Sequence, residues 1–271
     1  MNSPNAGELF TGAVAKLYEQ YLVPLLFEPY ALDLAQRLAS RGPARVLELA
    51  AGTGVVTRAL GSALPRSEIV ATDWSQPMLD VAAEIGTPRP VVWRQADAME
   101  LPFVDGTFDA VVCQFGVMFF PDKAKAYSEA HRVLARGGVL LFNVWDRIEE
   151  NELAHTVEAA LATVFPDDPP RFMGRTPHGY HQPGVVARDL ERGGFRSPPQ
   201  FATVAARSRA PSAADAAVAY CQGTPLRGEI VARDAARLDE ATQTSAKAIA
   251  ERFGPGPVDA KMQAHVVTIE R

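Results

Sequence analysis

The fold is decided by the stretch Val46-Leu47-Glu48-Leu49-Ala50-Ala51-Gly52-Thr53-Gly54-Val55-Val56-Thr57. Its first four residues form a mostly apolar run, which is typical of a strand buried on both faces of a parallel sheet. Two glycines follow, and after them apolar residues recur with helical spacing. Gly52 and Gly54 keep side chains away from the backbone, and the first N–H groups of the helix point at whatever lies over the turn. The stretch therefore predicts a site for a small-molecule cofactor.

Two residues of this stretch indicate which cofactor it binds. A dinucleotide fingerprint has the pattern G-x-G-x-x-G/A, whereas Thr57 stands at the third of these positions here. The acid inside the strand, Glu48, is not part of that fingerprint. The stretch closely resembles the first motif of the class I S-adenosylmethionine-dependent methyltransferases, whose usual pattern has a further glycine where this chain has Ala50. The resemblance implies that Glu48 lies near the methionine end of the cofactor, and that Ala50, Gly52 and Gly54 pass under it.

A second acid ends the next predicted strand, which runs from Glu68 to Asp73. Asp73 comes 19 residues after Gly54, close to the spacing of about 20 at which a carboxylate binds ribose hydroxyls. The alternative is an acid that merely flanks a helix. Trp74 could stack on adenine, because a flat base suits an aromatic platform. The order from Asp73 to Leu79 resembles the second motif of the same methyltransferases, which adds Trp74 and Met78 to the predicted cofactor contacts.

A third acid follows the predicted strand from Val91 to Ala96. The resemblance implies that Asp97 accepts a hydrogen bond from the adenine amino group, that the backbone N–H of Ala98 reaches a ring nitrogen, and that Met99 lies beside them. The alternative for Asp97 is a turn aspartate, which is common at the end of a strand.

The fourth predicted strand, Phe108 to Phe115, ends at the mouth where open α/β sheets bind ligands. In the family that this chain resembles, the backbone at Gln114 and Phe115 contacts the methionine part of the cofactor. Phe119 and its neighbour Phe120 would wall the substrate pocket, or would pack in the core.

Strands and helices alternate from Val46 onward, which is typical of a doubly wound sheet. The resemblance implies an α/β, Rossmann-like, seven-stranded sheet with an antiparallel last strand, predicted at Met262 to Ile269, plus helical cap elements over the cofactor site. We expect a single methyltransferase domain over residues 1–271, divided into N-terminal helices covering the cofactor (1–44), a cofactor-binding core (45–145) and candidate substrate-cap insertions (146–183 and 207–257).

The N-terminal segment has helical spacing of apolar residues from Glu8 to Leu22. Pro24 is expected to interrupt this helix before a second one begins at about Pro29. Many related methyltransferases cover the cofactor with a tyrosine of such a helix, which implies a cofactor contact for Tyr21 and a substrate contact for Tyr18. Both tyrosines could equally pack in the core with their hydroxyls at its edge.

Methyl transfer is an in-line displacement, so the protein mainly aligns donor and acceptor and excludes water. A general base is needed only if the acceptor carries a proton of high pKa. The candidates for catalysis are His178, Tyr180 and His181, the densest group of proton-transfer side chains beyond the core. Arg227 could bind an anionic substrate. The alternatives are an ordinary polar surface loop and an exposed arginine.

Composition limits the partners. The 271 residues are 47% apolar and carry a net charge of −5, which argues against a nucleic-acid partner because phosphate binding requires a basic surface. Cys113 and Cys221 have no metal-ligand spacing and are expected to be unpaired thiols. No apolar run is long enough to span a membrane and the N-terminus does not resemble a secretory signal, so we expect a cytoplasmic protein and leave a homodimer open.

The resemblance implies an S-adenosylmethionine-dependent methyltransferase that acts on oxygen, nitrogen, sulfur or carbon of a small molecule, with S-adenosylhomocysteine as product. The alternative is a non-catalytic scaffold or sensor that binds either nucleoside. Glu48, Thr57 and Asp97 disfavour a nicotinamide dehydrogenase. Amino-group DNA methylases carry D/N-P-P-Y/F after the fourth strand and protein arginine methylases carry two glutamates there, whereas this chain has the sequence Gln114-Phe115-Gly116.

Overall fold

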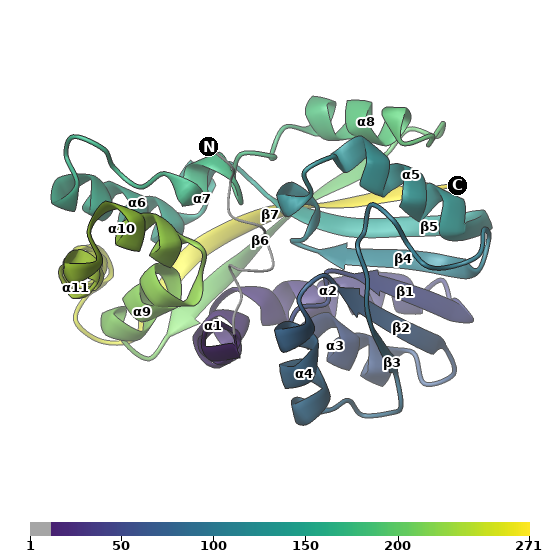
Figure 1. The fold of residues 1–271 in the computed structure, drawn as a ribbon, viewed down its shortest axis with the longest axis horizontal. Helices are drawn as coiled ribbons and strands as arrows, with labels where there is room; N and C mark the ends of the chain where they lie inside the picture. The colour runs from purple at the N-terminus through teal and green to yellow at the C-terminus, as the bar shows by residue number, and fades with distance from the viewer. Residues whose placement is uncertain (1–11) are drawn as a thin grey trace. The chain divides into compact units, whose positions relative to one another are not determined.

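The computed structural model describes residues 12–271, which form two compact units (Figure 1). The sheet unit consists of Pro29–Trp145, Tyr180–Val204 and Ala264–Arg271. The helical unit consists of the described residues up to Glu28, together with Asp146–Gly179 and Ala205–Gln263.

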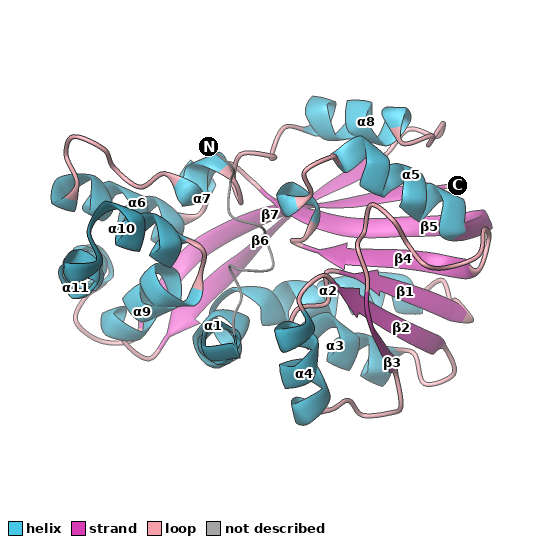
Figure 2. Ribbon diagram, in the orientation of Figure 1, coloured by secondary structure: helices cyan, strands magenta, loops and turns pink. Residues whose placement is uncertain are grey.

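A seven-stranded sheet has the strand order β3-β2-β1-β4-β5-β7-β6 (Figure 2). Strands β1 to β5 pair in parallel, and β7 is antiparallel to β5, with Val139 opposite Glu270. The predicted doubly wound sheet with an antiparallel last strand is therefore confirmed. The strands are β1 Arg45–Leu49, β2 Glu68–Asp73, β3 Val92–Gln95, β4 Phe108–Gln114, β5 Leu134–Trp145, β6 Gln200–Ala210 and β7 Val258–Glu270.

Helices cover both faces of the parallel strands in the sheet unit. Leu34 of α2 and Leu60 of α3 share one apolar core with Leu141 of β5. The neighbouring residue of β5, Phe142, packs against Tyr127 of α5, with the ring centroids 5.5 Å apart. Because successive strand residues point to opposite faces, α5 covers the other side. The helices of this unit are α2 Glu28–Ala39, α3 Val55–Ala63, α4 Gln76–Ile85, the short η3 Val117–Phe119, α5 Lys123–Val133 and α8 Pro183–Arg192. The first residue of α2, Glu28, belongs to the helical unit.

Small and polar residues make some of the contacts between helices of the helical unit. Cys221 of α9 lies 3.5 Å from the hydroxyl of Ser245 of α11, and Arg252 of α11 donates to Glu152 of α6 at 3.0 Å. Its helices are α1 Gly12–Leu17, η2 Tyr18–Phe27, η4 Ile148–Glu150, α6 Glu152–Val164, α7 Phe172–Arg175, α9 Ala213–Gly223, α10 Leu226–Asp234, η5 Ala235–Arg237 and α11 Leu238–Phe253. Between residues 12 and 271, no helix combines the length and apolar composition that crossing a membrane requires.

The predicted break at Pro24 is wrong. The helix continues through this proline in wide turns, in which the N–H of Glu28 donates to the carbonyl of Val23 five residues earlier. Proline has no N–H and crowds the preceding turn, and a widened turn accommodates both effects without ending the helix. The part of the predicted first helix at residues 8–11 lies outside the described residues.

The helical segment from Leu226 to Phe253 is interrupted at Asp234. Asp234 leaves helical geometry with φ −160°, and its side chain accepts from the N–H of Ala236 at 2.9 Å. A short aspartate side chain that bonds the backbone two residues on competes with the helical hydrogen bonds, so the chain turns before α11 begins.

Candidate cofactor site

The glycine turn lies at the carboxyl end of β1, within the sheet unit. The N–H of Ala51 donates to the carbonyl of Thr72 at 2.9 Å, which attaches the turn to β2. Gly52 and Gly54 have φ values of +57° and +84°. Glycine adopts this left-handed region at little cost, so the chain reverses here and enters α3 directly.

Gly54 is also required by the space around it. A Cβ built on this residue would lie 2.8 Å from the Trp93 ring and 3.2 Å from the Cβ of Ala82. The predicted role of this glycine, the close approach of backbone and neighbouring groups, therefore includes packing against α4 and β3.

Glu48 is almost fully buried, with 1% of its surface exposed. Its Oε2 accepts a hydrogen bond from the Thr57 hydroxyl at 2.6 Å. This bond explains why a threonine stands where a dinucleotide motif has a glycine. Burial raises the pKa of Glu48 to about 8, the Thr57 bond opposes this, and the nearby Asp73 raises the pKa further. At neutral pH Glu48 is therefore mainly a neutral acid that a nearby cation would ionise.

Asp73 connects the glycine turn to the start of α4. Its Oδ2 accepts from the N–H of Gly52 and its Oδ1 from the N–H of Ser75, both at 2.8 Å. Burial raises the pKa of Asp73, whereas the hydrogen bonds from the Ser75 and Gly52 N–H groups lower it. A carboxylate oxygen has two lone pairs, so each oxygen of Asp73 can still accept a hydrogen bond from a ligand hydroxyl.

The residues predicted to contact adenine follow β2 and β3. The Trp74 side chain is 48% exposed, whereas Met78 is buried in the core at 3%. Asp97 accepts from the N–H of Met99 at 2.8 Å, so it has the turn geometry that was the alternative for this residue. The second carboxylate oxygen of Asp97 can accept a hydrogen bond from a ligand while the turn is kept. Ala98, beside it, is half-buried.

Phe115 directs its side chain into the core. Its ring stacks on Trp145, with centroids 3.8 Å apart and planes 5° apart, and meets the edge of Tyr30 at 5.2 Å. Its φ is +49°, and its N–H donates to Oδ1 of Asn143 at 2.9 Å. A cofactor contact at Phe115 would therefore use its backbone. Asn143 was missed by sequence reasoning, although a polar residue in the apolar run of β5 was a usable signal.

Similarity to known proteins points to the same kind of site. Residues 47–142 match the family model described as a methyltransferase domain. The chain is 43% identical over 113 residues to the demethylmenaquinone methyltransferase of Thermus thermophilus, covering 41% of this chain and 50% of the relative. It is 33% identical over 156 residues to the malonyl-[acyl-carrier protein] O-methyltransferase of Geobacter sulfurreducens, covering 57% of each. The match runs from β1 into β5 and supports the expected resemblance to the class I S-adenosylmethionine-dependent methyltransferases.

The chain spans about half the length of the curated relatives that it matches first. Solved structures support the fold alone. A methyltransferase structure from Bacillus halodurans aligns over 88% of this chain and 97% of its own, with 19% identity and a TM-score of 0.54. An N-methyltransferase from Haemonchus contortus, in complex with phosphomonomethylethanolamine and S-adenosylhomocysteine, aligns over 96% of this chain and 58% of its own, with 15% identity and a TM-score of 0.58.

The residues predicted to act in catalysis belong to both units of the chain. In the helical unit, His178 is 4% exposed and its Nδ1 lies 2.8 Å from the carbonyl oxygen of Asp146. Because a carbonyl only accepts, Nδ1 carries a proton. In the sheet unit, Tyr180 donates to Asp189 at 2.9 Å, and burial raises the pKa of Tyr180. His181 is half-buried.

The remaining predicted contacts are distributed over four elements. In η2, Tyr18 stacks on Phe27 with centroids 5.2 Å apart, and Tyr21 is half-buried. Gln114 ends β4, and Phe119 ends η3; both are half-buried. Arg227 is exposed on α10. No group of His, Cys, Asp and Glu within residues 12–271 is arranged to hold a metal ion.

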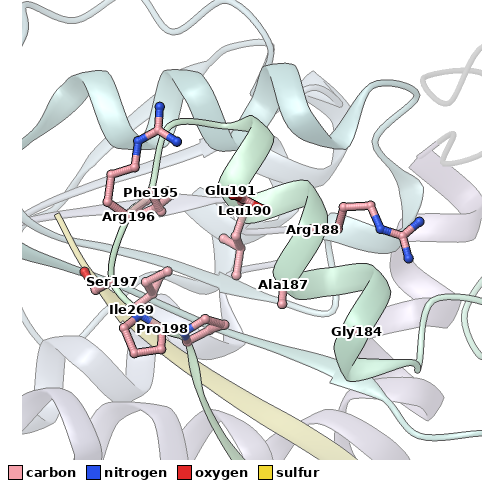
Figure 3. Close-up of a pocket in the computed structure, with 11 residues that line it drawn as sticks. Gly184, Ala187, Arg188, Leu190, Glu191, Phe195, Arg196, Ser197, Pro198 and Ile269 are labelled. Carbon is pink, nitrogen blue, oxygen red and sulfur yellow. The ribbon is translucent and has the colours of Figure 1, made fainter.

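A hollow of about 490 Å³ lies elsewhere in the sheet unit, between α8, the loop after it and β7 (Figure 3). Its lining is mostly apolar, as Leu190, Phe195 and Ile269 illustrate. Ile269 pairs with Leu140, close to the amino end of the parallel ladder of β5. The glycine turn and Asp73 follow the carboxyl ends of β1 and β2, so this hollow is separate from the candidate cofactor site.

Proposed function

We propose that this protein is an S-adenosylmethionine-dependent methyltransferase that acts on a small-molecule acceptor. The observation that carries the proposal is the position of Asp73, whose two oxygens hold the N–H groups of Gly52 and Ser75. A ribose that donates its hydroxyls to this carboxylate is brought directly to the glycine turn. The carboxylate therefore places the sugar beside the backbone that is to receive the methionine end.

The residues present fit this cofactor chemically. The hydroxyls of ribose and the amino group of adenine are donors, and Asp73 and Asp97 are acceptors. The half-exposed Trp74 ring offers a face to the base. The buried acid of Glu48 would compensate the positive charge of a sulfonium. Oγ1 of Thr53, in the turn, is buried without a hydrogen-bond partner among the described residues, which leaves one more polar atom for a ligand.

The bound cofactor supplies an electrophilic methyl group, so the chain itself needs to bind, orient and exclude water. We propose that residues 146–183 and 207–257 of the single methyltransferase domain provide the acceptor-binding groups. If the acceptor carries a proton of high pKa, His178 is a candidate base, with Nε2 as the accepting atom because Nδ1 donates to Asp146. Among the relatives, a quinone C-methyltransferase and a malonyl O-methyltransferase make carbon and oxygen acceptors the first to test.

Calorimetry with Asp73→Asn tests the cofactor site. Losing one charged acceptor should weaken S-adenosylmethionine binding by about 1–3 kcal/mol, or roughly 10- to 100-fold. Asp109→Asn is a matched control, because Oδ2 of Asp109 also accepts two backbone N–H groups, those of Ala44 and Arg45, each at 2.9 Å. Asp109 lies at the start of β4, away from the carboxyl ends of the strands, so this variant should keep wild-type affinity.

Unchanged affinity in a folded Asp73→Asn variant would refute the proposed site. Turnover is a separate measurement, made by following S-adenosylhomocysteine formation with a panel of acceptors that includes quinols and malonyl thioesters. Product formation supports an enzyme. Cofactor binding with no product across the panel would instead favour a protein that only binds the nucleoside.

A further inference from the structure

Two small residues meet where neighbouring strands end. Ala50 follows β1 and Gly116 lies two residues after β4, and the ladder between these strands pairs Leu49 with Cys113. A Cβ built on Gly116 would lie 2.5 Å from the Cβ of Ala50 and 2.7 Å from Sγ of Cys113. Cβ atoms in proteins essentially never approach other atoms this closely. The Ala50 methyl group therefore occupies the space that a side chain at position 116 would need.

The alanine of this pair has the backbone conformation that is typical of glycine, and the glycine has one that is open to any residue. Ala50 has a φ of +53°, a left-handed conformation that is unfavourable for every residue except glycine. Gly116 has φ −96° and ψ −39°, which any residue can adopt. Position 116 thus needs glycine because there is no room for a Cβ, not because of its backbone conformation. Position 50 carries alanine although its left-handed conformation favours glycine. Backbone hydrogen bonds beside it, such as that from the Ala51 N–H to Thr72, hold this strained residue in place.

The loop after β4 is firmly held on its other sides. The N–H of Phe115 donates to Asn143, and Nζ of Lys123 donates to the carbonyl of Phe120 at 3.0 Å. The Phe120 ring lies 3.8 Å from the Cβ built on Gly116. The glycine turn is held as well, because the Ala51 and Gly52 N–H groups donate to Thr72 and Asp73 of β2. A change at the contact between Ala50 and Gly116 should therefore strain both loops.

From this contact we infer that Ala50 and Gly116 are a pair of positioning residues, which sets the separation of the two loops that receive the methionine end of the cofactor. The inference rests on the proposed function. Beyond Leu49 and Cys113 the strand ladder no longer controls the distance between the chains, and the single methyl group does so instead. Ala50→Gly should let the turn shift within the limits set by its hydrogen bonds to β2, and Gly116→Ala should push the two loops apart.

The test is a double-mutant cycle on the full chain, with Ala50→Gly, Gly116→Ala and the combined variant. Dissociation constants for S-adenosylmethionine come from calorimetry, and unfolding free energies come from urea titrations. Ala50→Gly should weaken binding about fivefold or more, which is about 1 kcal/mol, without lowering stability, since it removes the unfavourable conformation. In the combined variant the methyl group at 116 replaces the one at 50, so binding should be tighter than in Gly116→Ala alone.

Gly184→Ala is the control for adding a methyl group, because a Cβ there meets no atom within 4 Å, and it should keep wild-type affinity. If Gly116→Ala fails to fold, Ala50→Gly decides alone. Wild-type affinity in Ala50→Gly, or effects of the two changes that simply multiply, would overturn the inference. A wild-type chain that binds neither S-adenosylmethionine nor S-adenosylhomocysteine would overturn the proposed function itself, so the two failures are distinguishable.

Discussion

Glu48 should make the folded protein less stable as the pH rises through the neutral range, and Glu48→Gln should remove this dependence. Burial raises the pKa of its carboxyl group from 4.5 to about 8. The charged groups that act on it are Asp73, which raises the pKa, and Arg58, which lowers it. The neighbouring thiol of Cys113 stays neutral, because burial raises its pKa to about 12.

The sign follows from the protons that each state binds. Between pH 4.5 and about 8 the folded chain keeps the proton on Glu48, whereas the unfolded chain has lost it. The free energy of unfolding therefore falls with rising pH, by about 1.4 kcal/mol per pH unit from this group. The stabilisation is complete below pH 4.5 and is lost as the pH passes about 8. Between pH 5.5 and 7.5 the loss is about 3 kcal/mol.

Urea unfolding of the wild type and of Glu48→Gln at pH 5.5, 6.5 and 7.5 measures this contribution. Glutamine keeps an acceptor for the Thr57 hydroxyl but has no proton to lose. The difference in unfolding free energy between the two proteins cancels the other titrating groups, and it should change by about 3 kcal/mol over this range. Glu68→Gln is the control, because Glu68 is an exposed acid paired with Arg45. The difference in unfolding free energy between this variant and the wild type should change little with pH. A difference that stays constant with pH would refute the reasoning.

Two further predictions concern the proposed reaction. S-adenosylmethionine carries a positive charge at sulfur and S-adenosylhomocysteine does not. Affinity for S-adenosylmethionine should therefore rise relative to affinity for S-adenosylhomocysteine as the pH increases from about 6 to 8 and Glu48 ionises. Parallel calorimetry of both ligands measures the ratio of the two affinities, and a ratio that stays constant with pH contradicts the prediction. His178→Ala and His181→Ala should lower turnover while sparing cofactor affinity. Unaltered rates in both variants would exclude this segment from catalysis.

Much of the candidate site could be predicted because its signals are local. The strand predicted from Glu68 to Asp73 coincides with β2, since an apolar run that ends in a polar residue is a property of neighbouring residues. Ser75 precedes α4, but its side chain makes no capping hydrogen bond. The Asp73 carboxylate binds the Ser75 N–H instead, and a choice between two adjacent acceptors depends on how the turn folds.

Other features depended on contacts between distant segments. The helix through Pro24 contradicts a reliable local rule, because a wide turn relieved the clash that the rule assumes. The contact predicted at Phe115 concerned its backbone, and the position of its ring, which stacks in the core on Trp145 thirty residues later, came only from the structure. The close approach of Ala50 and Gly116 likewise joins two loops that the sequence separates.

The amino-acid sequence by itself determined the alternation of strands and helices, and it determined that Glu48, Asp73 and Asp97 lie in or directly after consecutive strands. Periodicity and turn chemistry act over a few residues, so they are visible in a single chain. Only the tertiary structure decided that Glu48 is neutral, that the Asp73 carboxylate holds the glycine turn, and that a glycine is needed at 116. The reason is physical: burial, charge coupling and steric exclusion are set by atoms that come together only when the sheet has formed.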